Sequence, residues 1–79
     1  MNLTIDVHGM TQVEAQKAIE QFIKNAPKNC ETVTVIHGYH SGQSLKTFIQ
    51  SRNGIRSKRV DRKRYSMNQG ETIFVLYKG

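Results

Sequence analysis

Polar and apolar residues alternate over the first eight positions of the chain. The apolar positions of this alternation are Leu3, Ile5 and Val7. A period of two predicts a strand with one buried face, and Gly9 breaks the pattern. Asp6 and His8 therefore project together from the more polar side of this strand.

The next segment changes to the spacing of an amphipathic helix. Thr11 and Glu14 have the spacing of a capping box, which predicts the helix start. Pro27 ends the helix. Between these limits the apolar residues recur at intervals of three and four and form one stripe, made of Ala15, Ala18, Ile19, Phe22, Ile23 and Ala26.

The middle of the chain predicts a second strand and a second helix. Residues 32–36 are rich in β-branched side chains, which favours a strand that runs into a loop over residues 37–42. Apolar positions with helical spacing then predict a short helix over residues 43–52. Asn53-Gly54 supplies its C-terminal stop.

Two further strands complete the predicted pattern. Residues 55–65 form the first of them, and residues 67–70 form the turn that follows. Residues 72–77 are almost continuously β-forming, which is typical of a strand buried on both sides.

The predicted order is β-α-β-α-β-β, which indicates an α/β two-layer sandwich. Because β-α-β crossovers are right-handed, both helices should lie on one face of a mixed four-stranded sheet. The first three strands should be parallel and the last antiparallel. A chain of 79 residues has room for one small core, so residues 1–79 are expected to form a single domain.

Composition narrows the setting of the protein. Cys30 is the single cysteine, so no disulfide framework can form, and a lone thiol fits a reducing compartment. No apolar run approaches the ~20 residues that a bilayer span needs, and the first residues do not resemble a signal peptide. We therefore expect a soluble, cytoplasmic protein, monomeric and without a membrane partner.

The formal net charge of +6 is concentrated in one segment. Residues 1–51 and residues 65–79 are each electrically balanced, so the whole excess lies in residues 52–64. An arginine-rich cluster favours a polyanion, because the guanidinium fork matches phosphate geometry. A solvated strand and an acidic protein partner are the alternatives. The cations, opposed only by Asp61, are Arg52, Arg56, Lys58, Arg59, Arg62, Lys63 and Arg64.

The predicted topology brings three side chains to one edge of the sheet. Parallel strands end at the same edge, so Asp6 and His8 should share a crevice with His37, and open α/β sheets bind ligands there. The following loop enters the first turn of the second helix, whose free N–H groups attract an anion. The residues of this loop are Gly38, Tyr39, His40, Ser41 and Gly42.

Asp6 and His8 have the spacing of a general-base pair. A carboxylate two residues away on a strand can orient the imidazole and stabilise its charged form. The alternatives are two surface residues that flank a turn, or a zinc site formed by the three histidines. Two-metal nucleases need several carboxylates, and Asp6 is the single acid expected at this crevice. We therefore expect a histidine-centred reaction with no metal and no cofactor.

Three motifs in order resemble the Smr (small MutS-related) domain family. Ile5-Asp6-Val7-His8-Gly9-Met10-Thr11 is similar to the L-D-x-H-G-x-T start of that family. Val35-Ile36-His37-Gly38 resembles its H-G-x-G motif, and Gly70-Glu71-Thr72-Ile73-Phe74-Val75 resembles its closing glycine turn and last strand. The matches extend over nearly the whole chain.

The resemblance implies a nucleic-acid-associated module with DNA-nicking or RNA-cleaving activity in many members and ribosome-linked roles in some. It assigns Asp6 and His8 to the catalytic D-x-H motif, and His37 with Gly38 to the start of the substrate loop. The chain departs from the family pattern at two places. His37-Gly38-Tyr39-His40 lacks the second glycine of H-G-x-G, and the closing motif is reduced to Asn68-Gln69-Gly70-Glu71.

Two functions follow as leading and alternative hypotheses. The first is a nucleic-acid-binding, metal-independent endonuclease that nicks DNA or cleaves RNA. In it, Asp6 orients His8 as the base, and His37, the loop amides and nearby arginines stabilise the charge on the phosphate. The alternative is a non-catalytic RNA- or DNA-binding or ribosome-associated module. A small phosphorylated metabolite bound at the second helix is a third, weaker hypothesis.

Overall fold

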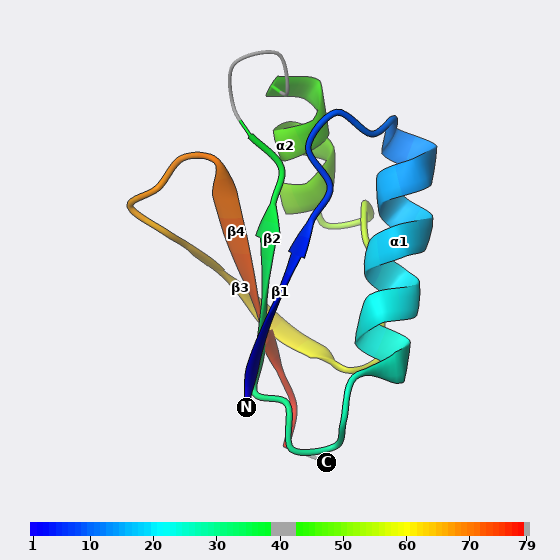
Figure 1. The fold of residues 1–79 in the computed structure, drawn as a ribbon, viewed down its shortest axis with the longest axis vertical. Helices are drawn as coiled ribbons and strands as arrows, with labels where there is room; N and C mark the ends of the chain where they lie inside the picture. Colours follow the sequence, from blue (N-terminus) through cyan, green and yellow to red (C-terminus); the bar gives the residue numbers. More distant parts are fainter. Residues whose placement is uncertain (39–42, 79) are drawn as a thin grey trace.

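A computed structural model describes residues 1–38 and 43–78 of the chain (Figure 1). The elements are β1 (Asn2–Asp6), α1 (Gln12–Asn25), β2 (Thr32–Ile36), α2 (Gln43–Gln50), β3 (Val60–Tyr65) and β4 (Glu71–Leu76). This confirms the predicted β-α-β-α-β-β order. No helix in the described part of the chain is long and apolar enough to cross a membrane.

The four strands form one mixed sheet in the order β1-β2-β4-β3. β1 and β2 are parallel, while β4 is antiparallel to both of its neighbours, β2 and β3. The first three strands therefore run in the same direction, as predicted. β4 is inserted between β2 and β3, which leaves β1 and β3 as the two edge strands.

The sheet has one buried and one uncovered face. Alternate residues of β2 and β4 are buried on the helix side, namely Val33, Val35, Thr72, Phe74 and Leu76. The four apolar residues among them pack with Ala15, Ile19 and Ile23 of α1 and with Leu45 and Ile49 of α2. Figure 1 shows both helices on this side of the sheet. No helix of the described chain covers the opposite face, called here the open face.

The capping box predicted for α1 is present. The Thr11 hydroxyl accepts a hydrogen bond from the Glu14 amide at 3.1 Å, and the Glu14 carboxylate accepts one from the Thr11 amide at 3.0 Å. These bonds satisfy amide groups that the first helical turn leaves free. The helix ends at Asn25, two residues before Pro27, in agreement with the sequence pattern.

The segment before β3 differs from the prediction. The strand begins at Val60 instead of residue 55, and α2 ends at Gln50 instead of residue 52. Gly54 passes so close to α2 that a Cβ there would lie 1.9 Å from the Phe48 carbonyl oxygen. The Arg56 amide donates to the Glu20 carboxylate at 2.8 Å, which holds this backbone against α1 instead of in the sheet.

Candidate active site and basic surfaces

Asp6, the last residue of β1, and His8, two residues further on, form a hydrogen-bonded pair. One carboxylate oxygen, Oδ1 of Asp6, lies 2.6 Å from His8 Nδ1 and accepts the His8 backbone amide at 3.0 Å. Because a carboxylate oxygen accepts, Nδ1 is the donor and Nε2 of a neutral ring is left as a proton acceptor. The side chains are 71% and 51% exposed for His8 and Asp6, so Nε2 is accessible from solvent.

The charge of Asp6 is stabilised by the same contacts. The hydrogen bond from the His8 ring lowers the pKa of the Asp6 carboxyl below its ordinary value, and the His8 backbone amide lowers it further. Hydrogen bonds to the charged form of an acid favour that form. Asp6 is therefore ionised at neutral pH, as required of a residue that orients and stabilises an imidazole.

His37 lies at the same edge but is buried, with 1% of its surface exposed. Its Nδ1 lies 2.7 Å from the Gly38 carbonyl oxygen, and its Nε2 lies 2.8 Å from the Thr72 hydroxyl. Gln50 of α2 donates to that hydroxyl at 2.9 Å. A carbonyl oxygen only accepts, so Nδ1 donates to Gly38, while the Thr72 hydroxyl accepts from Gln50 and can donate its own hydrogen to Nε2. As placed, His37 can act on a substrate only through Gly38.

Gly38 connects the two histidines. It has a φ of +75°, a conformation that glycine adopts readily, and a Cβ there would lie 3.8 Å from His8 Cβ. The amides of His37 and Gly38 both donate to the Gly70 carbonyl, at 2.9 and 3.0 Å. The turn before β4 is therefore fastened to the end of β2 beside His8. The predicted loop residues Tyr39, His40, Ser41 and Gly42 lie outside the described residues.

The basic segment 52–64 is divided among several surfaces. Arg62 pairs in register with Val75, and Arg64 pairs with Ile73, so both arginines extend from the open face of the sheet. Asp6 lies on the same face, in register with Ile36 and, through it, with Glu71. β1 and β3 are separated by three strand spacings, or about 14 Å. The two arginines and the Asp6–His8 pair thus share a face but occupy opposite edges.

Two other cations of the segment bind the protein itself. Arg59 donates to the carbonyl oxygens of Ile23 at 2.6 Å, Ala26 at 2.7 Å and Pro27 at 2.9 Å. These are carbonyls at the end of α1, where positive charge is favourable. Lys63 donates to the Ser51 carbonyl and lies 5.8 Å from the centre of the Phe74 ring, and its burial lowers its pKa.

The remaining cations, Arg52, Arg56 and Lys58, are exposed on the segment between α2 and β3. Arg56 and Lys58 line a groove together with Lys17 and Lys24 of α1. Neither lysine was predicted from the sequence, because residues 1–51 carry no net charge. Lys17 and Lys24 are seven residues apart, which places them on one face of a helix. This spacing could have indicated a shared cationic surface.

No three histidine, cysteine, aspartate or glutamate side chains converge on a potential metal position within residues 1–38 and 43–78. Of the three histidines weighed as zinc ligands, His40 is not described. His8 faces solvent, whereas His37 has a partner at each ring nitrogen.

Comparisons with known proteins agree with the observed topology. A family model described as the Smr domain matches residues 5–70. Among solved structures, the Smr domain of MutS2 from Thermus thermophilus is similar to this chain with a TM-score of 0.71 and 23% sequence identity. The match covers 94% of this chain and 96% of that one. At this identity the likeness shows a shared fold. No curated protein matched significantly.

Proposed function

The chain belongs to the Smr domain family, which is associated with nucleic-acid binding and nicking endonuclease activity, and we propose that it binds nucleic acid and cleaves it at Asp6–His8. The observation that carries this proposal is the geometry of that pair. An ionised carboxylate fixes an exposed imidazole at 2.6 Å and leaves the outer ring nitrogen available to a substrate. This arrangement is that of an oriented general base.

In the proposed reaction, His8 Nε2 takes the proton from a water molecule or from a ribose 2′-hydroxyl. The resulting oxygen nucleophile forms a bond to phosphorus as the bond from phosphorus to the leaving oxygen breaks. The imidazolium then returns its proton to the leaving oxygen, and the Asp6 carboxylate stabilises the imidazolium in between. No electrons are exchanged with a cofactor in this sequence.

Binding and chemistry are assigned to different groups. Arg62 and Arg64 lie about 14 Å from β1, too far to touch the phosphate that His8 attacks. They can hold other phosphates of the same strand as it crosses the open face. The charge at the cleaved phosphate must be met by groups other than the His37 and Gly38 amides, because both already donate to the Gly70 carbonyl.

This occupation of both amides also favours a second candidate function. Oxyanion stabilisation is often the largest contribution to such a reaction, and neither the His37 nor the Gly38 amide is free to provide it. A non-catalytic module that binds RNA, DNA or a ribosome through its cations would need no such donor.

Cleavage of end-labelled RNA and DNA in EDTA separates the two functions. The proposal predicts product with the wild-type protein and none above background with His8→Ala. Thr4→Ala, an exposed position on the same strand, is the matched control and should cleave normally. Equal cleavage by His8→Ala would exclude His8 as the base. Binding by the wild-type protein without product would leave the non-catalytic function.

A further inference from the structure

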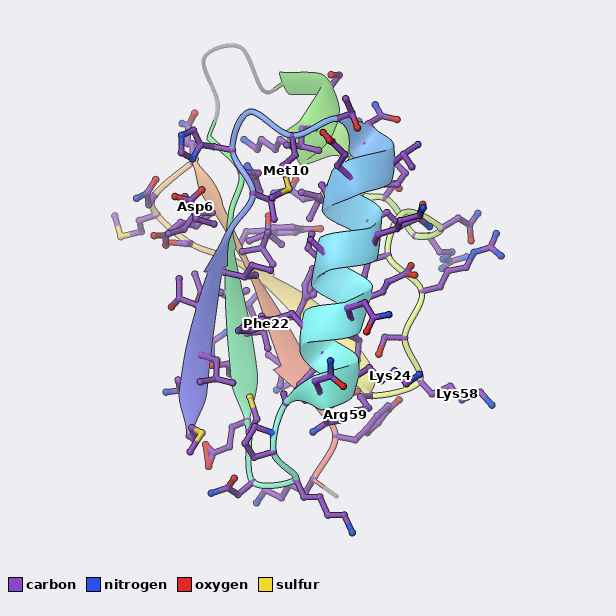
Figure 2. The ribbon with its side chains drawn as sticks, turned by 45° about the vertical axis from the view of Figure 1, so that its right-hand side comes forward. Asp6, Met10, Phe22, Lys24, Lys58 and Arg59 are labelled. Carbon is purple, nitrogen blue, oxygen red and sulfur yellow. The ribbon has the colours of Figure 1, made fainter. Side chains whose placement is uncertain are left out.

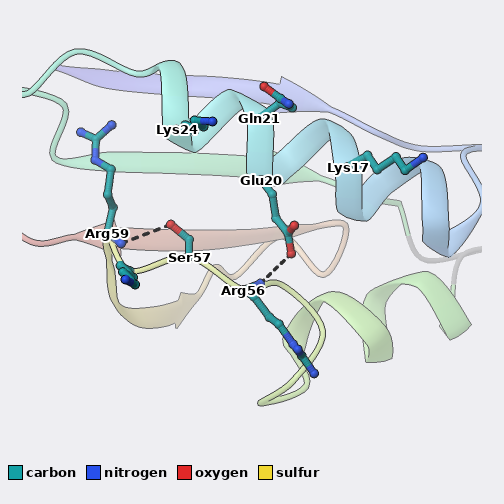
Figure 3. A pocket seen from close by; sticks show the side chains of 8 residues that line it. Lys17, Glu20, Gln21, Lys24, Arg56, Ser57 and Arg59 are labelled. Atoms are coloured by element: carbon teal, nitrogen blue, oxygen red, sulfur yellow. Dashed lines mark hydrogen bonds between the residues drawn. The ribbon is translucent and has the colours of Figure 1, made fainter.

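A groove of about 690 Å³ lies between α1 and the segment that leads into β3 (Figure 3). It belongs to the helix layer of the molecule, whereas Arg62 and Arg64 extend from the open face of the sheet. The residues that line it are Lys17, Glu20, Gln21, Lys24, Arg56, Ser57, Lys58 and Arg59. Five of these eight side chains are cationic.

The backbone of the groove is held in place by hydrogen bonds across it. Glu20 of α1 accepts the Arg56 amide at 2.8 Å and the Gln16 side-chain amide at 3.3 Å. Arg59 anchors the other end to the carbonyls that follow α1. The single carboxylate of the groove is therefore already hydrogen-bonded within the protein. The walls of the groove are held in place without a ligand.

Four cations remain exposed around this fixed frame: Lys17, Lys24, Arg56 and Lys58. They come from two chain segments more than thirty residues apart. Figure 2 shows Lys24 and Lys58 extending on the same side of the molecule, across α1 from Asp6. A groove lined by charges of one sign focuses their field and raises the local concentration of an oppositely charged partner.

The spacing of the two lysines on α1 fits a phosphate backbone. Seven residues of helix correspond to about 10.5 Å along its axis. This separation is long enough for Lys17 and Lys24 to contact different phosphates of one strand. Arg56 and Lys58 lie on the other wall, where they can contact the same backbone.

We propose that this groove is a second binding site for nucleic-acid phosphates, separate from the open face and from the Asp6–His8 edge. The inference rests on the proposed nucleic-acid function and extends it to residues of α1. Because the groove is distant from His8, its cations contribute to affinity and not to the rate at which bound substrate is cleaved.

The test compares two pairs of substitutions by fluorescence anisotropy. The probe is a labelled single-stranded RNA of about 12 nucleotides, and salt is varied between about 50 and 200 mM. Lys17→Gln/Lys24→Gln should reduce the slope of log affinity against log salt by about 1.4, since each lost single-strand contact removes ~0.7. Affinity should fall roughly 20-fold at about 0.1 M salt.

Lys28→Gln/Lys78→Gln is the matched control, because it removes the same charge from two exposed lysines beside a different hollow. Its slope should equal that of the wild-type protein. Lys17→Arg/Lys24→Arg keeps the charge and should keep the slope. Thermal unfolding of each pair verifies that it is folded.

The outcomes separate this inference from the proposed function. Binding by the wild-type protein with an unchanged slope for Lys17→Gln/Lys24→Gln overturns the groove and leaves the open face as the binding surface. An equal loss in the control pair also overturns it, because the effect would then be one of net charge. If the wild-type protein binds no nucleic acid, the proposed function itself fails.

Discussion

The Asp6–His8 pair and the basic segment 52–64 are the two features of the sequence that suggest a function. In the folded protein the residues of the pair lie together, whereas the cations of the segment are separated. The pair keeps the arrangement that its spacing implies, with one carboxylate oxygen bonded to both the ring and the amide of His8. The basic segment is continuous in sequence, but its cations are distributed over the open face of the sheet, the buried face of the sheet and the helix layer.

The reason for this difference is the range of the interactions involved. Asp6 and His8 are two residues apart on one strand and its extension, so a local backbone geometry is enough to bring them together. The cations of residues 52–64 belong to a loop and to an alternating strand with a bulge between Val60 and Arg62. Alternation turns Lys63 towards the core and Arg62 and Arg64 away from it.

Backbone carbonyls also compete for the cations. Arg59 is occupied by the end of α1 and Lys63 by the Ser51 carbonyl. A count of charges in a sequence segment is therefore an upper limit on the charge that the folded surface offers to a partner. The exposed lysines of α1 show the opposite error. The net charge of residues 1–51 is zero, although Lys17 and Lys24 add positive charge to one groove.

The largest expected effect tests the dependence of His8 on Asp6. Asp6→Asn retains the shape of the side chain but can donate to Nδ1, which would leave Nε2 protonated and unable to act as a base. Cleavage should fall by about 10²- to 10⁴-fold, the usual contribution of a positioned acid or base. Asp61→Asn, an exposed carboxylate beside Arg62, is the control and should retain full activity. Full activity in Asp6→Asn would show that the pair is only a surface contact.

The structural role of Arg59 predicts a loss of stability. Arg59→Gln removes three charge-assisted hydrogen bonds to the end of α1, and the free energy of unfolding should fall by about 2–3 kcal/mol. Arg56→Gln, at an exposed arginine of the same segment, should change it by less than about 0.5 kcal/mol. Urea denaturation measures both. Equal losses in the two variants would indicate that Arg59 is as free for a partner as its neighbour.

Much of the fold was predictable because its determinants are local. The capping box and Pro27 set the limits of α1, and the β-branched run set those of β2, each as expected. The start of β3 was predicted five residues early, because the residue types at positions 55–59 do not reveal the hydrogen bond from the Arg56 amide to Glu20. That contact joins residues 36 positions apart.

The candidate site was also predictable only where its arrangement depends on local structure and strand order. The meeting of His8 and His37 at one edge followed from the parallel strands. The burial of His37 did not, since its partners Thr72 and Gln50 come from β4 and α2. Long-range contacts of this kind convert a residue expected at the substrate into one that positions Gly38.

A smaller effect tests this view of His37. Thr72→Val keeps the shape of the buried side chain and removes the hydroxyl that links Gln50 to His37, which should cost about 2 kcal/mol of unfolding free energy. Thr72→Ser keeps the hydroxyl and loses one methyl group, which should cost about 1 kcal/mol. Urea denaturation compares them. A loss in Thr72→Val no greater than in Thr72→Ser would contradict the network.

The smallest effect is the titration of Asp6. Its pKa is lowered in the folded protein, so the stabilisation from this carboxylate is complete above its ordinary pKa and is lost as the pH falls through the lowered one. Carbon NMR of the carboxyl group should give a midpoint below the ordinary value. His8→Ala should raise the midpoint part of the way, because the amide of residue 8 still donates. Identical midpoints would show that the ring does not hold Asp6.

Single-turnover cleavage at saturating protein tests the division between chemistry and binding most directly. The central claim is that Asp6–His8 performs the reaction while Arg62 and Arg64 only hold the substrate. Arg62→Gln/Arg64→Gln should then raise the dissociation constant roughly 20-fold at about 0.1 M salt and leave the saturated rate unchanged. His8→Ala should leave the dissociation constant unchanged and lower the saturated rate. A saturated rate that falls as far in the arginine pair as in His8→Ala would contradict the account.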